Sequence, residues 1–168
     1  MKAEPQKEHE WLHQLVGEWT YEAEARMGPD EPTHESTGTE TVRSLGGLWV
    51  IAEGQGTMPD DGAIGHTVMT LGYDPETERF VGTWIGSMMT HFWIYEGHLD
   101  EARRVLTLDC EGPAMTAEGA MAEGGATARY QDVLEILAPD HRTLSSQVLG
   151  EDGEWNRFMT AHYRRTGR

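Results

Sequence analysis

After residue 17, this sequence is a succession of short runs rich in Thr, Val, Ile and aromatic residues, and Gly, Pro or Asp residues separate the runs. Such runs are typical of β-strands, and the i, i+3, i+4 spacing of an amphipathic helix is absent from them. The pattern predicts about ten strands, at residues 18–26, 36–44, 48–57, 65–73, 79–87, 91–98, 104–110, 128–137, 142–149 and 155–165.

Short connections determine how these strands pair. Segments such as DPETE at 74–78, LDEAR at 99–103 and APDH at 138–141 leave room only for tight turns. Tight turns join antiparallel neighbours, so the strands should form an up-and-down meander. An open sheet of this size would leave an exposed edge, which closure removes. We therefore expect an all-β fold, an antiparallel up-and-down β-barrel of about ten strands.

A short helix is expected before the strands. Residues 6–16, QKEHEWLHQLV, follow Pro5, a residue favoured at helix starts, and end at Gly17. The apolar residues that fall on one face of this segment are Trp11, Leu12, Leu15 and Val16. This spacing predicts a short amphipathic helix.

The length of 168 residues suits a single domain, 1–168, with a core of its own. Residues 112–128 are rich in Gly, Ala and Met, so we expect a flexible loop there. Cys110 is the single cysteine, which excludes an internal disulfide. The N-terminus lacks the apolar core of a signal peptide, and no run reaches the roughly 20 apolar residues of a membrane helix. We therefore expect a cytoplasmic protein of bacterial type.

The charge of the chain argues against two classes of partner. The sequence has 29 acidic and 13 basic residues, which gives a net charge of −16 with neutral histidines. A chain this acidic repels phosphate backbones and anionic lipid surfaces. Nucleic acids and membranes are therefore not expected partners.

Two predicted hairpins indicate which residues share a face. If Tyr73 pairs with Phe80 and Gly86 with His91, both turns give one consistent register. One face then carries Met69, Leu71, Tyr73, Phe80, Trp84, His91, Trp93 and Tyr95. The opposite face carries Val68, Thr70, Val81, Thr83, Ile85, Phe92 and Ile94. Because neither face is polar, one should line the barrel interior and the other should meet a second subunit, which predicts a homodimer.

The segment HEWLH at 9–13 has the H-E-x-x-H spacing of zinc metalloproteases. Such a site needs a third protein ligand. Here the helix is short and terminal, no second helix is expected after it, and His9 and His13 should face solvent. We therefore interpret the segment as part of an ordinary helix and expect neither a zinc protease nor a metal site there.

Gly17-Glu18-Trp19 follows the helix and opens the first strand. This sequence resembles the G-x-W signature of the calycin superfamily, which includes lipocalins and fatty-acid-binding proteins. The resemblance implies that the helix plugs one end of the barrel. It also implies that an arginine of the last strand, Arg164 or Arg165, lies over the Trp19 ring.

Over nearly its full length the chain is similar to a bacterial family called domain of unknown function 1579. The resemblance lies in segments such as LVGEW, SLGGLWV, MTLGYDP, FVGTWIGSMMTHFW and MTAHYRR. It implies a lipocalin-like barrel but does not indicate which reaction, if any, the protein catalyses.

The first hypothesis for function is a barrel that binds a small, largely apolar ligand. Barrels of this strand number can enclose one small ligand between apolar walls and a few polar anchors. The expected ligand-binding residues, with His91 as the polar group, are Trp49, Met69, Tyr73, Trp84, His91, Trp93 and Tyr95. The alternative is that these side chains fill a solid core.

Two further hypotheses use other residues. The chain resembles nitrobindins in having a histidine near the C-terminus, which implies haem or metal binding through His162, with His91 nearby. A barrel enzyme would instead use Glu53, Asp132 and His91 as acid and base groups. The sequence pairs no nucleophile with a base, and Cys110 is expected to be a small buried hydrophobic residue. It therefore identifies no reaction and no cofactor.

Overall fold

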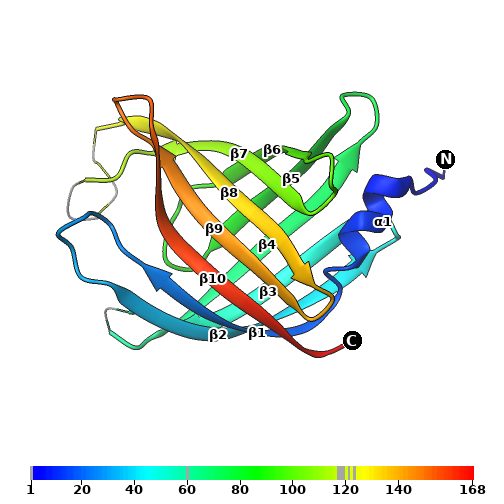
Figure 1. Ribbon diagram of the computed structural model, residues 1–168, viewed down its shortest axis with the longest axis horizontal. Coiled ribbons are helices and arrows are strands. Elements are labelled where there is room, and N and C mark those ends of the chain that lie inside the picture. Colours follow the sequence, from blue (N-terminus) through cyan, green and yellow to red (C-terminus); the bar gives the residue numbers. More distant parts are fainter. Residues whose placement is uncertain (1, 60, 117–119, 121, 123) are drawn as a thin grey trace.

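A computed structural model of the protein describes residues 2–59, 61–116, 120, 122 and 124–168. Within these residues, ten antiparallel strands close into one barrel in chain order, and one helix lies beside one end of it (Figure 1). The elements are α1 Lys7–His13, β1 Gly17–Ala25, β2 His34–Leu45, β3 Trp49–Thr57, β4 Ile64–Asp74, β5 Arg79–Gly86, β6 Trp93–Leu99, β7 Val105–Pro113, β8 Thr127–Ala138, β9 His141–Leu149 and β10 Trp155–Gly167. The predicted all-β up-and-down barrel is confirmed.

The helix is shorter than predicted. The sequence pattern gave 6–16, but the α-helix ends at His13, and tighter three-residue hydrogen bonds from Leu15 and Val16 follow it. Gly17 then starts β1. A Cβ atom at this position would lie 2.4 Å from Arg165 Nη1, so the first residue of the G-x-W segment has no room for a side chain.

Trp19 lies at the helix end of the barrel and is 2% exposed. Its indole Nε1 donates to the Leu15 carbonyl oxygen at 2.9 Å. Arg165 lies over the ring, 4.3 Å from its centroid, so of the two arginines that the resemblance offered it is Arg165 that stacks there. Arg142 lies 4.5 Å from the same ring centroid. A cation over an indole face is favourable, and more so away from water.

The predicted hairpin registers of β4, β5 and β6 are largely confirmed. Met69 pairs with Trp84, and Trp84 pairs with Trp93. The expected pair of Gly86 and His91 does not form, because the β5–β6 ladder ends at the pair of Trp84 and Trp93. The face that carries these aromatic residues points into the barrel.

The opposite face of the same strands points outward and is largely apolar. Ile85, Phe92 and Ile94 are 48%, 54% and 61% exposed. We refer to this surface as the outer apolar patch; its residues are Ile51, Val68, Thr70, Val81, Thr83, Ile85, Phe92 and Ile94.

β3 turns Glu53 outward, whereas the barrel-enzyme hypothesis requires this carboxyl inside the barrel. Val50 and Ala52 face the core, so Trp49, Ile51 and Glu53 face outward. The inward positions of β3 continue with glycines, and a Cβ at Gly56 would lie 2.1 Å from the Tyr21 hydroxyl oxygen. Small residues therefore point inward here, since the Tyr21 ring occupies the adjacent interior.

The stretch expected to be a flexible loop, 112–128, is partly strand. β7 continues through Pro113 and β8 begins at Thr127. Residues 117–119, 121 and 123 of the expected loop lie outside the described residues. The end of β7 and the start of β8 lie at the end of the barrel opposite α1 (Figure 1).

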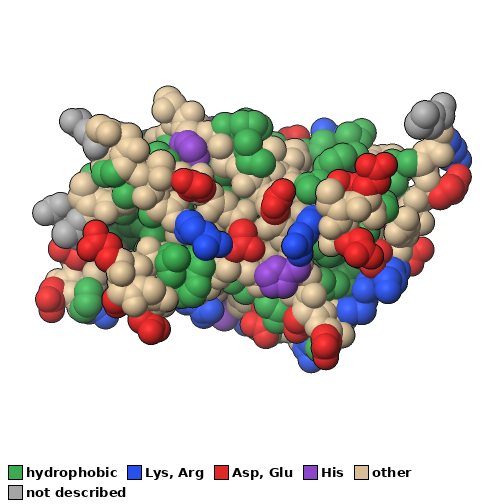
Figure 2. Space-filling model, turned by 90° about the horizontal axis from the view of Figure 1, so that it is seen from above, with side chains coloured by type: hydrophobic (Ala, Val, Ile, Leu, Met, Phe, Trp, Pro, Cys, Tyr) green, Lys and Arg blue, Asp and Glu red, His purple; other side chains and the backbone are tan. Residues whose placement is uncertain are grey.

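On the face shown in Figure 2, acidic side chains lie among basic and hydrophobic ones. Within the described part of the chain, no helix has the length and apolar composition that a membrane span requires.

Candidate functional site

The barrel interior contains a cavity of about 190 Å³, which we call the deep cavity. Its lining residues come from β5 to β10 and from the turn between β5 and β6; they are Trp84, Met89, Trp93, Tyr95, Cys110, Tyr130, Asp132, Ser146 and Phe158. An apolar cavity of about 150 Å³ is large enough to hold benzene. The deep cavity therefore has room for a ligand of about one aromatic ring with a short substituent.

Aromatic rings form most of the wall of this cavity. The ring centroids of Trp93 and Tyr130 lie 5.1 Å apart at 87°, and those of Tyr130 and Phe158 lie 6.3 Å apart at 85°. Edge-to-face contacts of this kind are favourable and hold rings in fixed orientations. Trp93 Nε1 donates to Met89 Sδ at 3.2 Å, and the Tyr130 hydroxyl donates to the Pro113 carbonyl oxygen at 2.5 Å. The polar atoms of the Trp93 and Tyr130 rings are thus satisfied by the protein.

Asp132 is the one carboxyl group among the lining residues. It lies beside Ser146 in the β8–β9 ladder, and the Ser146 hydroxyl donates to its Oδ1 at 2.5 Å. The hydroxyl of Tyr95, from β6, donates to its Oδ2. Hydroxyl groups of β6, on one side of β8, and of β9, on the other side, therefore hold this carboxyl in place.

Burial sets the protonation of the groups around the cavity. It raises the pKa of Asp132, while the hydrogen bonds from Ser146 and Tyr95 oppose that change. Burial and the nearby Asp132 also raise the pKa of Tyr95 well above its ordinary value. The Cys110 thiol has its pKa raised to about 12, first by burial and then by Asp132 and Asp109. Tyr95 and Cys110 are therefore neutral at pH 7.

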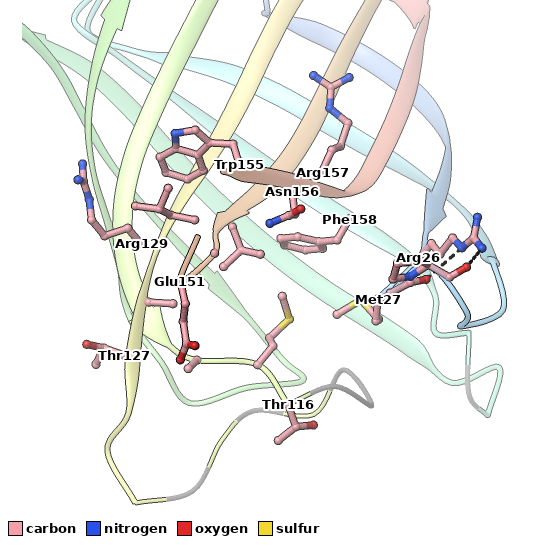
Figure 3. A pocket seen from close by; sticks show the side chains of 18 residues that line it. Arg26, Met27, Thr116, Thr127, Arg129, Glu151, Trp155, Asn156, Arg157 and Phe158 are labelled. Carbon is pink, nitrogen blue, oxygen red and sulfur yellow. Dashed lines mark hydrogen bonds between the residues drawn. The ribbon is translucent and has the colours of Figure 1, made fainter. Parts of the chain in front are cut away.

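A second recess lies at the open end of the barrel and has a volume of about 750 Å³; we call it the mouth pocket. It lies between the turn after β1, the β7–β8 connection and the β9–β10 hairpin, and Figure 3 shows its lining side chains. Arg26 is bound to its own turn, because its guanidinium donates to the carbonyl oxygens of Gly28, Pro29 and Glu31.

Phe158 lines both the deep cavity and the mouth pocket. The β9–β10 register shifts between Arg157 and Met159, so Phe158 is the extra residue of a β-bulge. Such an insertion redirects side chains at barrel rims. Here it places an aromatic ring between the open end and the interior.

The structure separates the seven residues that the sequence predicted for a ligand site. Trp84, Trp93 and Tyr95 line the deep cavity together. Met69 belongs to the core closer to α1, beside a void of about 20 Å³. Tyr73 also lies near α1, with its ring centroid 5.7 Å from that of His9.

The two remaining residues of that set lie outside the cavity wall. Trp49 is 39% exposed on the outer surface, where its ring covers Gly72. His91 packs edge-on against Trp93, with centroids 4.6 Å apart, and its Nε2 donates to the Glu111 carbonyl oxygen at 3.0 Å. It contacts the Trp93 ring but does not itself line the cavity.

His162, the histidine proposed for haem or metal binding, lies on the outer face of β10. Its Nδ1 is 3.0 Å from Nε2 of His141, another surface residue. Among the described residues, no three His, Cys, Asp or Glu side chains lie close enough together to bind a metal ion. Glu53 is on the outer surface near Arg43, with 3.9 Å between Oε1 and Nε. Glu53, Asp132 and His91 are therefore not brought together.

The two histidines of HEWLH have structural contacts. His9 was expected to face solvent, but it is 4% exposed. Its Nδ1 accepts a hydrogen bond from the Gln6 backbone at 2.9 Å, and its Nε2 donates to the Tyr73 carbonyl oxygen at 3.1 Å. Nδ1 thus caps the start of α1, and Nε2 connects the helix to β4. His13 lies 3.3 Å from the Ser44 hydroxyl.

Sequence reasoning missed several residues of the cavity wall: Met89, Tyr130, Ser146 and Phe158. The alternation of Tyr130, Asp132 and Leu134 along one strand was a usable signal, since alternate residues share a face. Ser146 required the β8–β9 register, and Phe158 required the bulge, which changes the alternation of β10.

Comparisons with known proteins agree with the barrel fold. The family model described as a protein of unknown function, DUF1579, matches residues 4–165. Among curated proteins, none matches this sequence. Among solved structures, Rv2717c from M. tuberculosis is 12% identical with a TM-score of 0.59, over 97% of this chain and 99% of that chain. The S-type phycobiliprotein lyase CPES from Guillardia theta is 13% identical with a TM-score of 0.57, over 95% and 93% of the two chains. At these identities the likeness concerns the fold alone.

Proposed function

This chain belongs to the DUF1579 family of proteins of unknown function, and from the geometry of its barrel we propose that it binds a small, largely apolar ligand in the deep cavity. The observation that supports this proposal is a cavity walled by five aromatic side chains inside an otherwise packed barrel. Ligand sites are typically concave and apolar, with a small number of polar groups.

The architecture favours a preformed site. The helix end of the barrel is filled by a continuous hydrophobic core, whereas the cavity lies toward the open end. Phe158 contributes to both recesses, so a ligand that enters from the mouth pocket passes this ring. A rigid aromatic wall loses little entropy on binding, which is the usual advantage of a preorganised site.

The first test is native mass spectrometry of the freshly purified protein, compared with its denatured mass. The proposal predicts that the native mass exceeds the denatured mass by the mass of one small ligand, which is less than that of a large cofactor. Denaturation should release this ligand. A calorimetric titration with benzyl alcohol tests occupancy directly, because one aromatic ring with a short substituent matches the volume of the deep cavity.

The variant Trp93→Ala should weaken the binding of benzyl alcohol by about tenfold or more, since it removes an aromatic wall of the cavity. Trp49→Ala is the matched control, because it removes the same side chain from the outer surface. Binding that is equal in both variants, or absent from the wild type in both measurements, would contradict the proposal.

A further inference from the structure

The deep cavity contains one carboxyl group without a cationic partner. The ion pairs of the described residues are Lys7–Glu8, Arg43–Glu53 and Arg142–Glu40, and none includes Asp132. The nearby titratable groups are Tyr95, Cys110 and Tyr163, and burial raises the pKa of each of them. All three are neutral at pH 7, so Asp132 is the one group of the cavity wall that can carry a negative charge when it is ionised.

Glu40, another acid of the barrel interior, provides a contrast. Its Oε1 lies 2.5 Å from Nη2 of Arg142, whose side chain is only 4% exposed. Burying a charge is costly unless it is paired and hydrogen-bonded. Among the described residues, the fold supplies a cation to Glu40 and two hydroxyl donors, with no cation, to Asp132.

Asp132 still has acceptor capacity. An ionised carboxylate offers about four lone-pair sites, and the hydroxyls of Ser146 and Tyr95 use two of them. Both hydroxyls donate to the carboxyl, so they stabilise its charged form. A ligand N–H group that carries positive charge would complete this arrangement.

The aromatic wall favours the same kind of ligand. The faces of Trp, Tyr and Phe rings attract cations within about 6 Å of the ring centroid, more strongly when water is excluded. Trp84, Trp93 and Tyr130 lie in the same cavity wall as Asp132. This combination of rings and a carboxylate suits an organic ammonium group with an apolar body.

The arginines of the mouth pocket do not oppose such a ligand in the deep cavity. Arg129 and Arg157 lie on the outward faces of β8 and β10, and in Figure 3 their side chains point away from the centre of the pocket. Arg26 is occupied by the carbonyl oxygens of its own turn. The whole chain, with a net charge of −16, also attracts small cations.

We propose that the deep cavity binds a small arylalkyl amine in its ammonium form, with the nitrogen at Asp132 and the ring among Trp84, Trp93 and Tyr130. This inference rests on the proposed function and specifies its ligand class. It excludes carboxylates and phosphates of the same size, since these would meet the buried acid.

The experiment compares three probes of similar shape by isothermal titration calorimetry at pH 7: benzylamine, benzyl alcohol and benzoate. The amine should bind wild-type protein about tenfold more tightly than the alcohol, the factor expected from one charge-assisted hydrogen bond. Benzoate should bind least. This comparison needs no variant, so it does not depend on the folding of a mutant.

Asp132→Asn should abolish the preference for the amine while the alcohol still binds. The matched control is Asp109→Asn, because Asp109 precedes Cys110 on β7 and accepts from Gln131 outside the cavity wall. If wild type binds amine and alcohol equally, the inference is overturned and the proposed function stands. If none of the three probes binds, both are contradicted. An amine preference that survives in Asp132→Asn would also overturn the inference.

Discussion

Cys110 is a residue whose ionisation the fold changes strongly. Its thiol has an ordinary pKa of 9.0, which rises to about 12 in the folded barrel because of burial and the neighbouring Asp132 and Asp109. Between these two values the folded protein retains the thiol proton and the unfolded chain releases it. The unfolded state therefore binds fewer protons, and stability falls as pH rises through this window.

We therefore predict that part of the alkaline loss of stability comes from Cys110. The free energy of unfolding, from urea titrations at pH 8 and pH 10.5, should fall less in Cys110→Ala than in the wild type. Tyr95 and Tyr163 contribute in the same direction, but they are present in both proteins and cancel in the comparison. Equal losses in the two proteins would show that Cys110 keeps an ordinary pKa.

At the scale of elements, the sequence predicted the number, order and approximate bounds of the strands. Their turn residues and alternating composition are local signals, and the β4–β5 register follows from the short DPETE turn. The side of β3 that faces inward was not predictable in this way. Both of its faces carry apolar residues, and the choice depends on Tyr21 of β1, which fills the interior beside the β3 glycines.

The cavity wall was predictable only in part for a related reason. Trp84, Trp93 and Tyr95 belong to one meander whose turns fix the register, so they were grouped from the sequence. Asp132 meets Tyr95 from β6 across the intervening strand β7, and this contact depends on the curvature of the closed barrel. No local pattern indicates such a contact.

The helix end of the barrel offers a test at this scale, because Arg165 joins three elements. Its guanidinium donates to the carbonyl oxygens of Gln14, Val16 and Pro139, and it stacks on Trp19. These contacts connect the end of α1, the start of β1 and the β8–β9 turn to β10.

Arg165→Gln should destabilise the protein by about 2–3 kcal/mol, since it removes charge-assisted hydrogen bonds and a cation–π contact. Arg164→Gln is the matched control: this neighbouring residue is exposed, and its replacement should change the free energy of unfolding by less than about 0.5 kcal/mol. Chemical denaturation of the two variants and the wild type measures both values. An equal loss of unfolding free energy in the two variants would mean that Arg165 contributes through its charge alone, and that its hydrogen bonds and its stacking on Trp19 do not stabilise the protein.

At the scale of the whole molecule, a closed barrel has no free sheet edge, so copies can associate only through side chains. Each chain carries a net charge of −16, and two copies repel one another over most of their surfaces. The outer apolar patch contains no charged residue, and its central row runs across four strands, from Ile51 through Thr70 and Thr83 to Ile94. The homodimer expected from the sequence remains a prediction. Because the outer apolar patch is free of charge, we expect it to form the interface.

Such a dimer should become tighter as salt is added, because salt screens the repulsion between two acidic chains and leaves apolar burial intact. Light scattering coupled to size-exclusion chromatography, at low and at high salt, measures this change in mass. Ile94→Glu should give a monomer in both conditions, since it adds a buried like charge to each copy. Leu137→Glu is the matched control, because Leu137 is 38% exposed on β8 and lies outside the patch. A wild type that is monomeric at both salt concentrations, or a control variant that dissociates as readily as Ile94→Glu, would argue against this interface.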